Sequence, residues 1–275
     1  MKIEQLAINA VSTTHSGLVE CLDAYSAAGF KKVEFPMWLV KDYLKEGNTI
    51  EDVKALLDDR GMQCIGGWEC HVACFWEEDK EEVFALLRKN AELISALGGT
   101  GMVCGTDGPK EGQEFDDVLQ PIVDGFSDAA DMIADTGVTI YLEFNWSPIV
   151  KSLRTGAEVA RRTGKDNVRI VFDPAHYHCT PSKFSQLTPE NVAMIGHVHV
   201  NNMADKPGEL CDCNGDRVLP AEGCLDLDAI FGKLEECGYK GDFSIEMFTQ
   251  SLYDMPASEA AATMYQSLLP LTSDG

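Results

Sequence analysis

Short apolar runs rich in β-branched residues alternate along the chain with longer segments of helical periodicity. The predicted strands cover residues 5–8, 32–35, 63–67, 101–104, 139–144, 169–172, 195–200 and 243–248. The predicted helices cover residues 18–28, 50–60, 80–97, 115–136, 156–163, 226–237 and 257–269. Strands that alternate with helices in this way are typical of an α/β fold with a parallel sheet.

Glycine recurs where most of the predicted helices end. The positions are Gly29, Gly61, Gly98, Gly137, Gly164 and Gly238. Glycine is common just after a helix because it adopts a left-handed conformation at little steric cost. The 275 residues provide about 34 for each of eight strand–helix units, so we expect a single (β/α)8 TIM barrel domain over residues 1–275. A doubly wound open sheet is the alternative, but the Gly-x-Gly-x-x-Gly turn typical of that fold does not follow the first strand.

Four late strands each carry an ionisable residue near the end that leads into the following loop. These residues are Glu143, Asp173, His199 and Glu246. Each lies among residues that favour burial, so strand alternation points each side chain into the barrel mouth. Three buried carboxylates would repel one another, whereas one divalent cation relieves all three and takes the imidazole as a fourth ligand. We therefore expect a metal site at the C-terminal rim of strands 5–8, suited to Mn²⁺, with Mg²⁺, Co²⁺ or Zn²⁺ as alternatives. The alternative interpretation is that these four residues are unrelated to one another and simply lie at exposed strand ends.

Other residues near this rim have two interpretations each. His197 lies two residues before the predicted histidine ligand and on the same strand face, which favours a hydrogen-bonded histidine deeper in the barrel over a direct ligand. His176 follows the predicted aspartate ligand by three residues and is placed to bind a substrate hydroxyl or to pack within its loop. Trp68 and Trp146, at the ends of the third and fifth strands, would form apolar walls for a substrate or pack at the rim.

The composition narrows the functional classes. The chain carries 45 Asp and Glu against 22 Lys and Arg, a net charge of −23, which disfavours binding to nucleic acids or anionic membranes. No run approaches the ~18 uninterrupted apolar residues of a membrane span, and the first residues lack the apolar segment of a signal peptide. We therefore expect a cytoplasmic protein. The ten scattered cysteines favour reduced thiols over disulfides or a thiolate zinc site.

Several motifs at the predicted strand ends occur together. They are Leu142-Glu143, Asp173-x-x-His176, Gly196-His197-x-His199, and Arg217-Val218-Leu219-Pro220-Ala221-Glu222-Gly223 before Ser244-Ile245-Glu246. This set resembles the xylose isomerase-like TIM barrel superfamily, in particular its sugar phosphate isomerase/epimerase branch. The C-terminal third is most similar to the 2-keto-myo-inositol isomerases, through Asp216-Arg217-Val218, Asp226-Leu227-Asp228-Ala229 and Glu246-x-Phe248. One departure is Ala221, where the usual Pro-Gly-x-Gly has its first glycine.

The resemblance implies one divalent cation held by Glu143, Asp173, His199 and Glu246. It implies that the two glutamates exchange protons with the substrate from opposite faces, and that His176 and Arg217 bind substrate oxygens. A cation on a ketone oxygen acidifies the adjacent C–H, and a carboxylate can then remove that proton to give a metal-stabilised cis-enediolate. Returning the proton to the neighbouring carbon isomerises the substrate, and returning it to the opposite face of the same carbon epimerises it.

We therefore expect a metal-dependent isomerase or epimerase of carbohydrate metabolism that acts on a ketose, a keto-inositol or a related sugar. Few basic residues lie near the rim, which disfavours a phosphorylated substrate. One rival is a lyase on the same scaffold, such as a 3-dehydroshikimate or inosose dehydratase, or the catalytic subunit of a C-glycoside-cleaving complex. Abasic-site endonucleases are a further rival that shares the fold, but they take metal-binding histidines from early strands. The non-enzymatic alternative is a metal-stabilised binding module, which would have no turnover. A homo-oligomer is compatible with the sequence.

Overall fold

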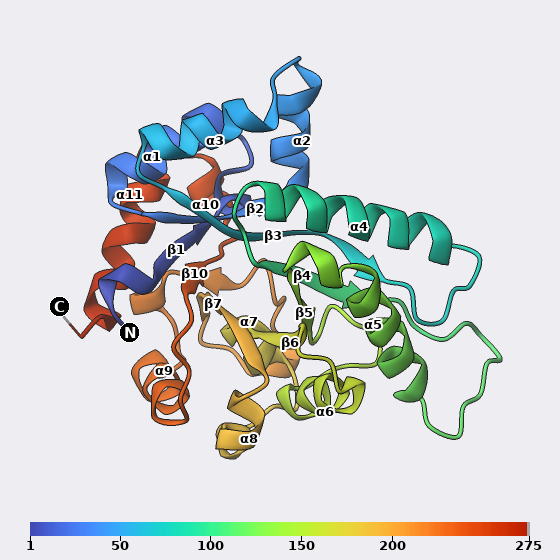
Figure 1. The fold of residues 1–275 in the computed structure, drawn as a ribbon. Helices are drawn as coiled ribbons and strands as arrows, with labels where there is room; N and C mark the ends of the chain where they lie inside the picture. The colour runs from blue at the N-terminus through green and yellow to red at the C-terminus, as the bar shows by residue number, and fades with distance from the viewer. Residues whose placement is uncertain (274–275) are drawn as a thin grey trace.

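The computed structural model describes residues 1–273. Eight parallel strands close into a barrel in the order β1-β10-β7-β6-β5-β4-β3-β2, with the helices packed around them (Figure 1). The barrel strands are β1 (Leu6–Asn9), β2 (Lys32–Pro36), β3 (Gln63–Val72), β4 (Gly101–Thr106), β5 (Thr139–Glu143), β6 (Val168–Phe172), β7 (Ile195–Val200) and β10 (Phe243–Ile245). The predicted (β/α)8 TIM barrel is confirmed.

The helices that cover the barrel are mostly those expected from periodicity. They are α1 (Leu18–Ala28), α3 (Ile50–Asp59), α4 (Lys80–Ala96), α5 (Gln120–Met132), α6 (Leu153–Thr163), α9 (Leu227–Glu236) and α11 (Ala257–Leu268). Four shorter helices were not predicted: α2 (Met37–Lys45), α7 (Pro174–Cys179), α8 (Pro189–Val192) and α10 (Gln250–Tyr253). Among residues 1–273, none of the helices combines the length and the apolar content that crossing a membrane requires.

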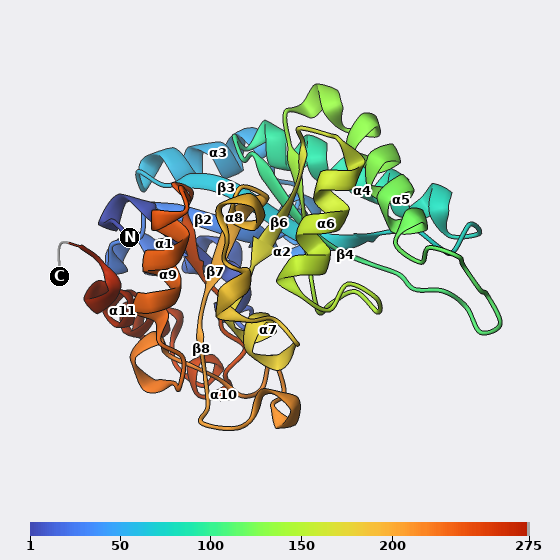
Figure 2. The same ribbon diagram turned by 90° about the horizontal axis from the view of Figure 1, so that it is seen from below.

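Some predicted boundaries are wrong, and each has a local cause. The helix expected over 115–136 begins only at Gln120, because Pro121 has no N–H and fits only the first turn. Residues before it form a segment that extends away from the barrel in both views (Figures 1 and 2). The helix expected from residue 156 begins three residues earlier, since the Ser152 hydroxyl caps it by accepting from the Thr155 N–H at 3.2 Å.

Two strands also differ in length from the prediction. β3 runs to Val72 instead of ending at residue 67, because an irregularity between Trp68 and Cys70 lets the pairing with β4 continue. The last strand, expected to reach residue 248, ends at Ile245, where the carbonyl of Glu246 accepts a hydrogen bond from the Arg217 side chain at 3.1 Å. Both changes occur at the C-terminal rim of the barrel.

A smaller element forms part of this rim. After β7, the two-residue strands β8 (Asn202–Met203) and β9 (Arg217–Val218) pair antiparallel. The Asn202 amide holds the turn that follows by donating to the Pro220 carbonyl at 2.8 Å. Ala221, where the resemblance led us to expect glycine, is exposed in this turn, so its methyl group lies in solvent.

Candidate metal centre and substrate pocket

The structure brings together the four residues that the sequence predicted as metal ligands. Glu143 ends β5, Asp173 directly follows β6, His199 lies in β7, and Glu246 directly follows β10. One ligand atom from each lies within 4.8 Å of the others. They meet because the parallel register aligns the ends of neighbouring strands, with His199 opposite Ser244 on β10.

The buried imidazole of His199 faces three carboxylates through its Nδ1 atom. Nδ1 lies 3.2 Å from Glu246 Oε2, 3.4 Å from Asp173 Oδ2 and 3.8 Å from Glu143 Oε1. Within residues 1–273 this buried nitrogen has no hydrogen-bond partner of ordinary geometry. A buried polar atom without a partner costs free energy, and a cation among these four side chains would satisfy it.

Asp173 is held by hydrogen bonds on all sides. Its Oδ1 caps α7 by accepting from the backbone N–H of Ala175 at 2.7 Å and that of His176 at 3.2 Å, and the Asn201 amide donates to both of its oxygens at 3.2 Å. Burial would raise the pKa of Asp173, but the Arg217 guanidinium, followed by nearby histidines, holds it well below its usual range. Asp173 is therefore a permanent carboxylate that can hold a cation but is poorly suited to accept a proton.

Arg217 packs against two of the predicted ligands. Its fully buried guanidinium donates to Glu246 Oε2 at 2.7 Å and lies 3.1 Å from Asp173 Oδ2. The Asn9 amide donates to the other oxygen of Glu246 at 2.9 Å. The sequence predicted a substrate-binding Arg217; the structure gives this side chain carboxylate partners, and a substrate contact remains a prediction.

The charges of this centre fit a divalent cation. Glu143, Asp173 and Glu246 bring three negative charges, and Arg217 supplies one positive charge. Three carboxylates against Arg217 and the cationic His176 still leave an excess of negative charge around the unpaired His199 nitrogen. Oxygen-rich donors with one imidazole suit Mn²⁺, Mg²⁺, Co²⁺ or Zn²⁺, and the donor set does not choose among them.

His176 is fully buried beside the centre. Its Nε2 lies 3.4 Å from Glu143 Oε1 without a hydrogen bond, and its Nδ1 lies 3.2 Å from the amide of Asn145. Asn145 takes the left-handed conformation, with φ of 82°, which directs the chain away from the strand end. Burial would lower the pKa of His176, but Asp173, followed by Cys213 and Glu143, raises it to about 10. His176 thus presents an N–H donor next to a predicted base.

A pocket of about 270 Å³ opens beside this centre, and Glu143 and Glu246 both line it. Trp68 and Trp146 also line it, and their role as walls for a substrate stays a prediction. Trp146 is 53% exposed, so a bound molecule would cover it. Trp68 Nε1 and the Thr106 hydroxyl are buried polar atoms without partners in the described chain. This pocket is smaller than the ~300–1,000 Å³ of sites for drug-sized ligands, and its unpaired donors suit a small polyhydroxylated molecule.

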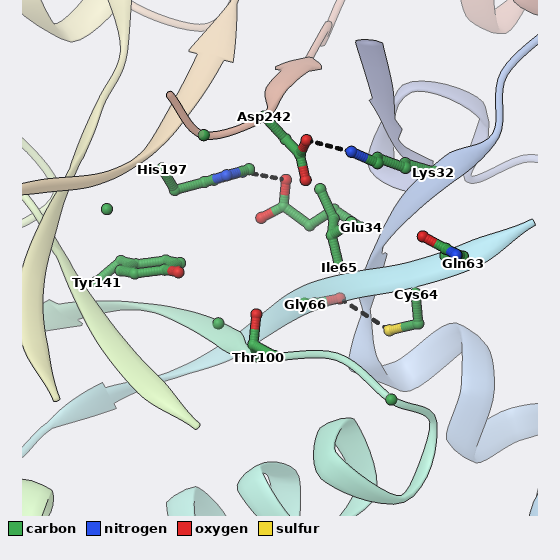
Figure 3. Close-up of a pocket in the computed structure, with 14 residues that line it drawn as sticks. Lys32, Glu34, Gln63, Cys64, Ile65, Gly66, Thr100, Tyr141, His197 and Asp242 are labelled. Atoms are coloured by element: carbon green, nitrogen blue, oxygen red, sulfur yellow. Dashed lines mark hydrogen bonds and ion pairs between the residues drawn. The ribbon is translucent and has the colours of Figure 1, made fainter. Parts of the chain in front are cut away.

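Sequence reasoning missed Glu34, which lies inside the barrel on β2. His197, predicted to be a hydrogen-bonded histidine deeper in the barrel, contacts Glu34 through Nε2 at 3.0 Å, in the pocket at the N-terminal end of the strands (Figure 3). Asn9 and Asn201 were missed as well. A single polar residue in an apolar strand gives no local signal of its partner, which here comes from a distant strand.

Comparison with known proteins extends these observations. Residues 22–268 match the xylose isomerase-like TIM barrel family. The inosose isomerase of Halalkalibacterium halodurans is 25% identical over 272 residues, which cover 96% of this chain and 94% of that protein. The inosose dehydratase of Erwinia tasmaniensis is 24% identical over 220 residues, which cover 70% of this chain and 72% of that protein. A crystal structure of the IolI protein with a bound zinc atom covers 98% of both chains at 24% identity, with a TM-score of 0.86.

The relatives are named as isomerases and dehydratases, and this chain, too, is an enzyme. The match covers the strands and loops that carry the candidate centre. The chain belongs to the xylose isomerase-like TIM barrel family.

Proposed function

We propose that this enzyme is a divalent-metal-dependent isomerase of a keto-inositol or a related ketose. The observation that supports this most strongly is the cluster of Glu143, Asp173, His199 and Glu246 with two of its carboxylates lining a small pocket. The similarity to an inosose isomerase over 94% of that protein favours a cyclic keto-polyol.

A divalent cation bound by these four side chains would polarise a substrate carbonyl and acidify the adjacent C–H. Asp173 and His199 are fully buried and hold fixed positions, so they serve as ligands only. Glu143 and Glu246 reach the pocket, and each can take up a proton from the substrate or return it.

The two glutamates differ in their surroundings. Both oxygens of Glu246 accept hydrogen bonds, from Asn9 and Arg217, which hold this carboxylate in one orientation. Glu143 accepts no hydrogen bond from the described residues, and its nearest cationic neighbour is His176. We therefore assign the removal of the C–H proton to Glu143, which passes it to the former carbonyl oxygen. Glu246 takes the proton of the neighbouring hydroxyl, which becomes the new carbonyl, and delivers it to the former carbonyl carbon, so both glutamates end as carboxylates.

The test is proton exchange in D2O followed by NMR. The metal-loaded enzyme should incorporate deuterium next to the keto group of an inosose or a ketose and form the isomer, and EDTA should abolish both. Glu143→Gln and Glu246→Gln should each lower turnover by about 10²–10⁴-fold, while Glu209→Gln, an exposed control, should retain it. Full turnover after metal removal, or in both Gln variants, would contradict the proposal.

Dehydration of the same substrate class is the second candidate. It is favoured by the His176 Nε2–H, which lies beside Glu143 and could protonate a leaving hydroxyl, and by the similarity to an inosose dehydratase. In the same NMR experiment, dehydration would give a product that has lost water and carries a C=C bond. An isomer that keeps all its hydroxyl groups would exclude it.

A further inference from the structure

A carboxylate that contacts two imidazoles lies in the interior of the barrel. Glu34 is only 1% exposed. Its Oε2 is 3.0 Å from His197 Nε2 and 3.2 Å from His199 Nε2, and its Oε1 is 3.4 Å from His199 Nε2. In Figure 3 the His197 ring points at this carboxylate, and the Lys32–Asp242 ion pair lies beside it at the floor of the barrel. Glu34 therefore has partners on two levels of the barrel.

The contact with Glu34 distinguishes the two nitrogens of His199. A carboxylate only accepts hydrogen bonds, so the Nε2 of His199 must carry the hydrogen. The opposite nitrogen, Nδ1, is then left to face Asp173, Glu143 and Glu246. A carboxylate behind a ligating histidine fixes both its tautomer and its ring orientation and makes it a stronger donor.

His197 holds Glu34 in place and is itself held by packing. Tyr141 on β5 stacks on the His197 ring, with 5.7 Å between centroids and 14° between planes. The Tyr141 ring fits only because Gly101 and Gly196 lie next to it, where an added Cβ would be 2.1 Å and 2.4 Å from its atoms. Tyr141 thus holds the His197 ring in place, His197 holds the Glu34 carboxylate, and Glu34 in turn orients the His199 ring.

From this geometry we propose that Glu34 is a positioning residue, which makes Nδ1 of His199 the metal-binding atom and thereby raises the affinity of the centre for its cation. The inference rests on the metal site of the proposed function but does not depend on which sugar is the substrate. Glu34, His197 and His199 also lie close enough together to hold a cation themselves. That arrangement would give two ions per chain, whereas our inference gives one.

The experiment is titration of the metal-free protein with Zn²⁺ by calorimetry. The wild type should bind one ion. Glu34→Ala should lower the affinity by about 10–100-fold, the range for loss of a partner behind a metal ligand. Glu34→Gln should lose less, because its amide oxygen still accepts from His199. His197→Gln should also lower the Zn²⁺ affinity, because Glu34 keeps its place but loses the contact with the His197 ring that holds it.

A matched control separates positioning from general damage to the fold. Asp107 is also a buried carboxylate, and it accepts backbone hydrogen bonds from Cys74, Phe75 and Trp76 at 2.8–3.2 Å. Asp107→Asn should lower the melting temperature but leave the Zn²⁺ affinity unchanged. Nitrogen-15 NMR of the zinc-loaded wild type should show His199 protonated at Nε2 and metal-bound at Nδ1.

The outcomes are distinct. Wild-type affinity in both Glu34 variants, coordination of zinc through Nε2, or a second ion lost with His197 would overturn the inference alone. If the Glu34 variants bind zinc more weakly, as expected, but the wild type turns over no keto-sugar, the inference is supported and the proposed function is not. A wild type that binds no zinc would overturn both.

Discussion

His199 faces carboxylates through both of its ring nitrogens, and this determines its charge before a metal ion binds. Burial would lower its pKa, but Glu246, Glu34 and Asp173 together raise it well above the usual value. The metal-free protein therefore carries a protonated His199 at neutral pH, paired with its acidic neighbours. A cation must displace the proton on Nδ1, because only the neutral nitrogen is a ligand.

Metal binding should accordingly release a proton and strengthen as the pH rises. A raised pKa means that the proton stabilises the metal-free form throughout the neutral range, so at neutral pH the ion competes with it. Calorimetry at pH 7 in two buffers of different ionisation enthalpy should report about one proton released per ion. A binding enthalpy that is the same in both buffers, together with an affinity that does not change from pH 6 to pH 8, would contradict this.

Arg217 should contribute more to stability than any exposed arginine, because it neutralises two buried carboxylates. Arg217→Met leaves Asp173 and Glu246 without their cation, and breaking such buried pairs costs about 3–5 kcal/mol. Arg162 provides the comparison: its ion pair with Asp117, at 2.7 Å, is partly exposed, and Arg162→Met should cost far less, because solvent screens such a pair. Urea unfolding of the metal-free proteins measures both. A similar loss in the free energy of unfolding for both variants would show that the Arg217 ion pairs do not stabilise the fold as described.

At the scale of single elements, the glycines predicted to end helices all have positive φ. The values range from 59° at Gly61 to 115° at Gly29, so the prediction is confirmed at each of the six positions. This feature could be derived from the sequence because it depends on a local backbone requirement. The start of α5 also has a local signal, Pro121. The prediction relied on helical periodicity instead and therefore placed the start too early in the chain.

A pair of substitutions tests this role of glycine. Gly137 has φ of 74° and open space around it, so Gly137→Ala should cost about 1 kcal/mol through backbone strain alone. Gly232 lies within α9, is exposed and also has open space. There, Gly232→Ala should stabilise the protein by about 0.5–1 kcal/mol, because alanine favours the helix. Thermal unfolding should give opposite signs for the two, and equal signs would contradict the assignment.

At the scale of the whole molecule, the sequence revealed the barrel and the four residues at its rim, because both follow from repeating patterns. Ionisable residues at the ends of successive apolar strands must meet once the barrel closes. The supporting residues could not be found in this way. Glu34 is 163 positions away from His197, and Asn9 is 237 positions from Glu246. Such pairs depend on the closure of β1 and β2 against the late strands, which no local pattern specifies.

The centre should also couple metal binding to the stability of the whole barrel, because its ligands come from four strands. A cation that binds only the folded state stabilises it by about 2.7 kcal/mol at a hundredfold excess over its Kd. Melting with and without Mn²⁺ should therefore show a clear rise in Tm for the wild type. His199→Ala should lose most of this rise, whereas His178→Ala, at a surface histidine bonded to the Lys206 carbonyl, should keep it. Equal shifts in both variants would place the ion elsewhere.

The location of the bound ion tests the central claim most directly. Crystals soaked in Mn²⁺ can be measured at the manganese absorption edge, and the anomalous difference map reports where the metal lies. The account predicts one strong peak, within bonding distance of Glu143, Asp173, Glu246 and the Nδ1 atom of His199. A map without a peak among these side chains, or with its strongest peak elsewhere on the protein, would contradict it.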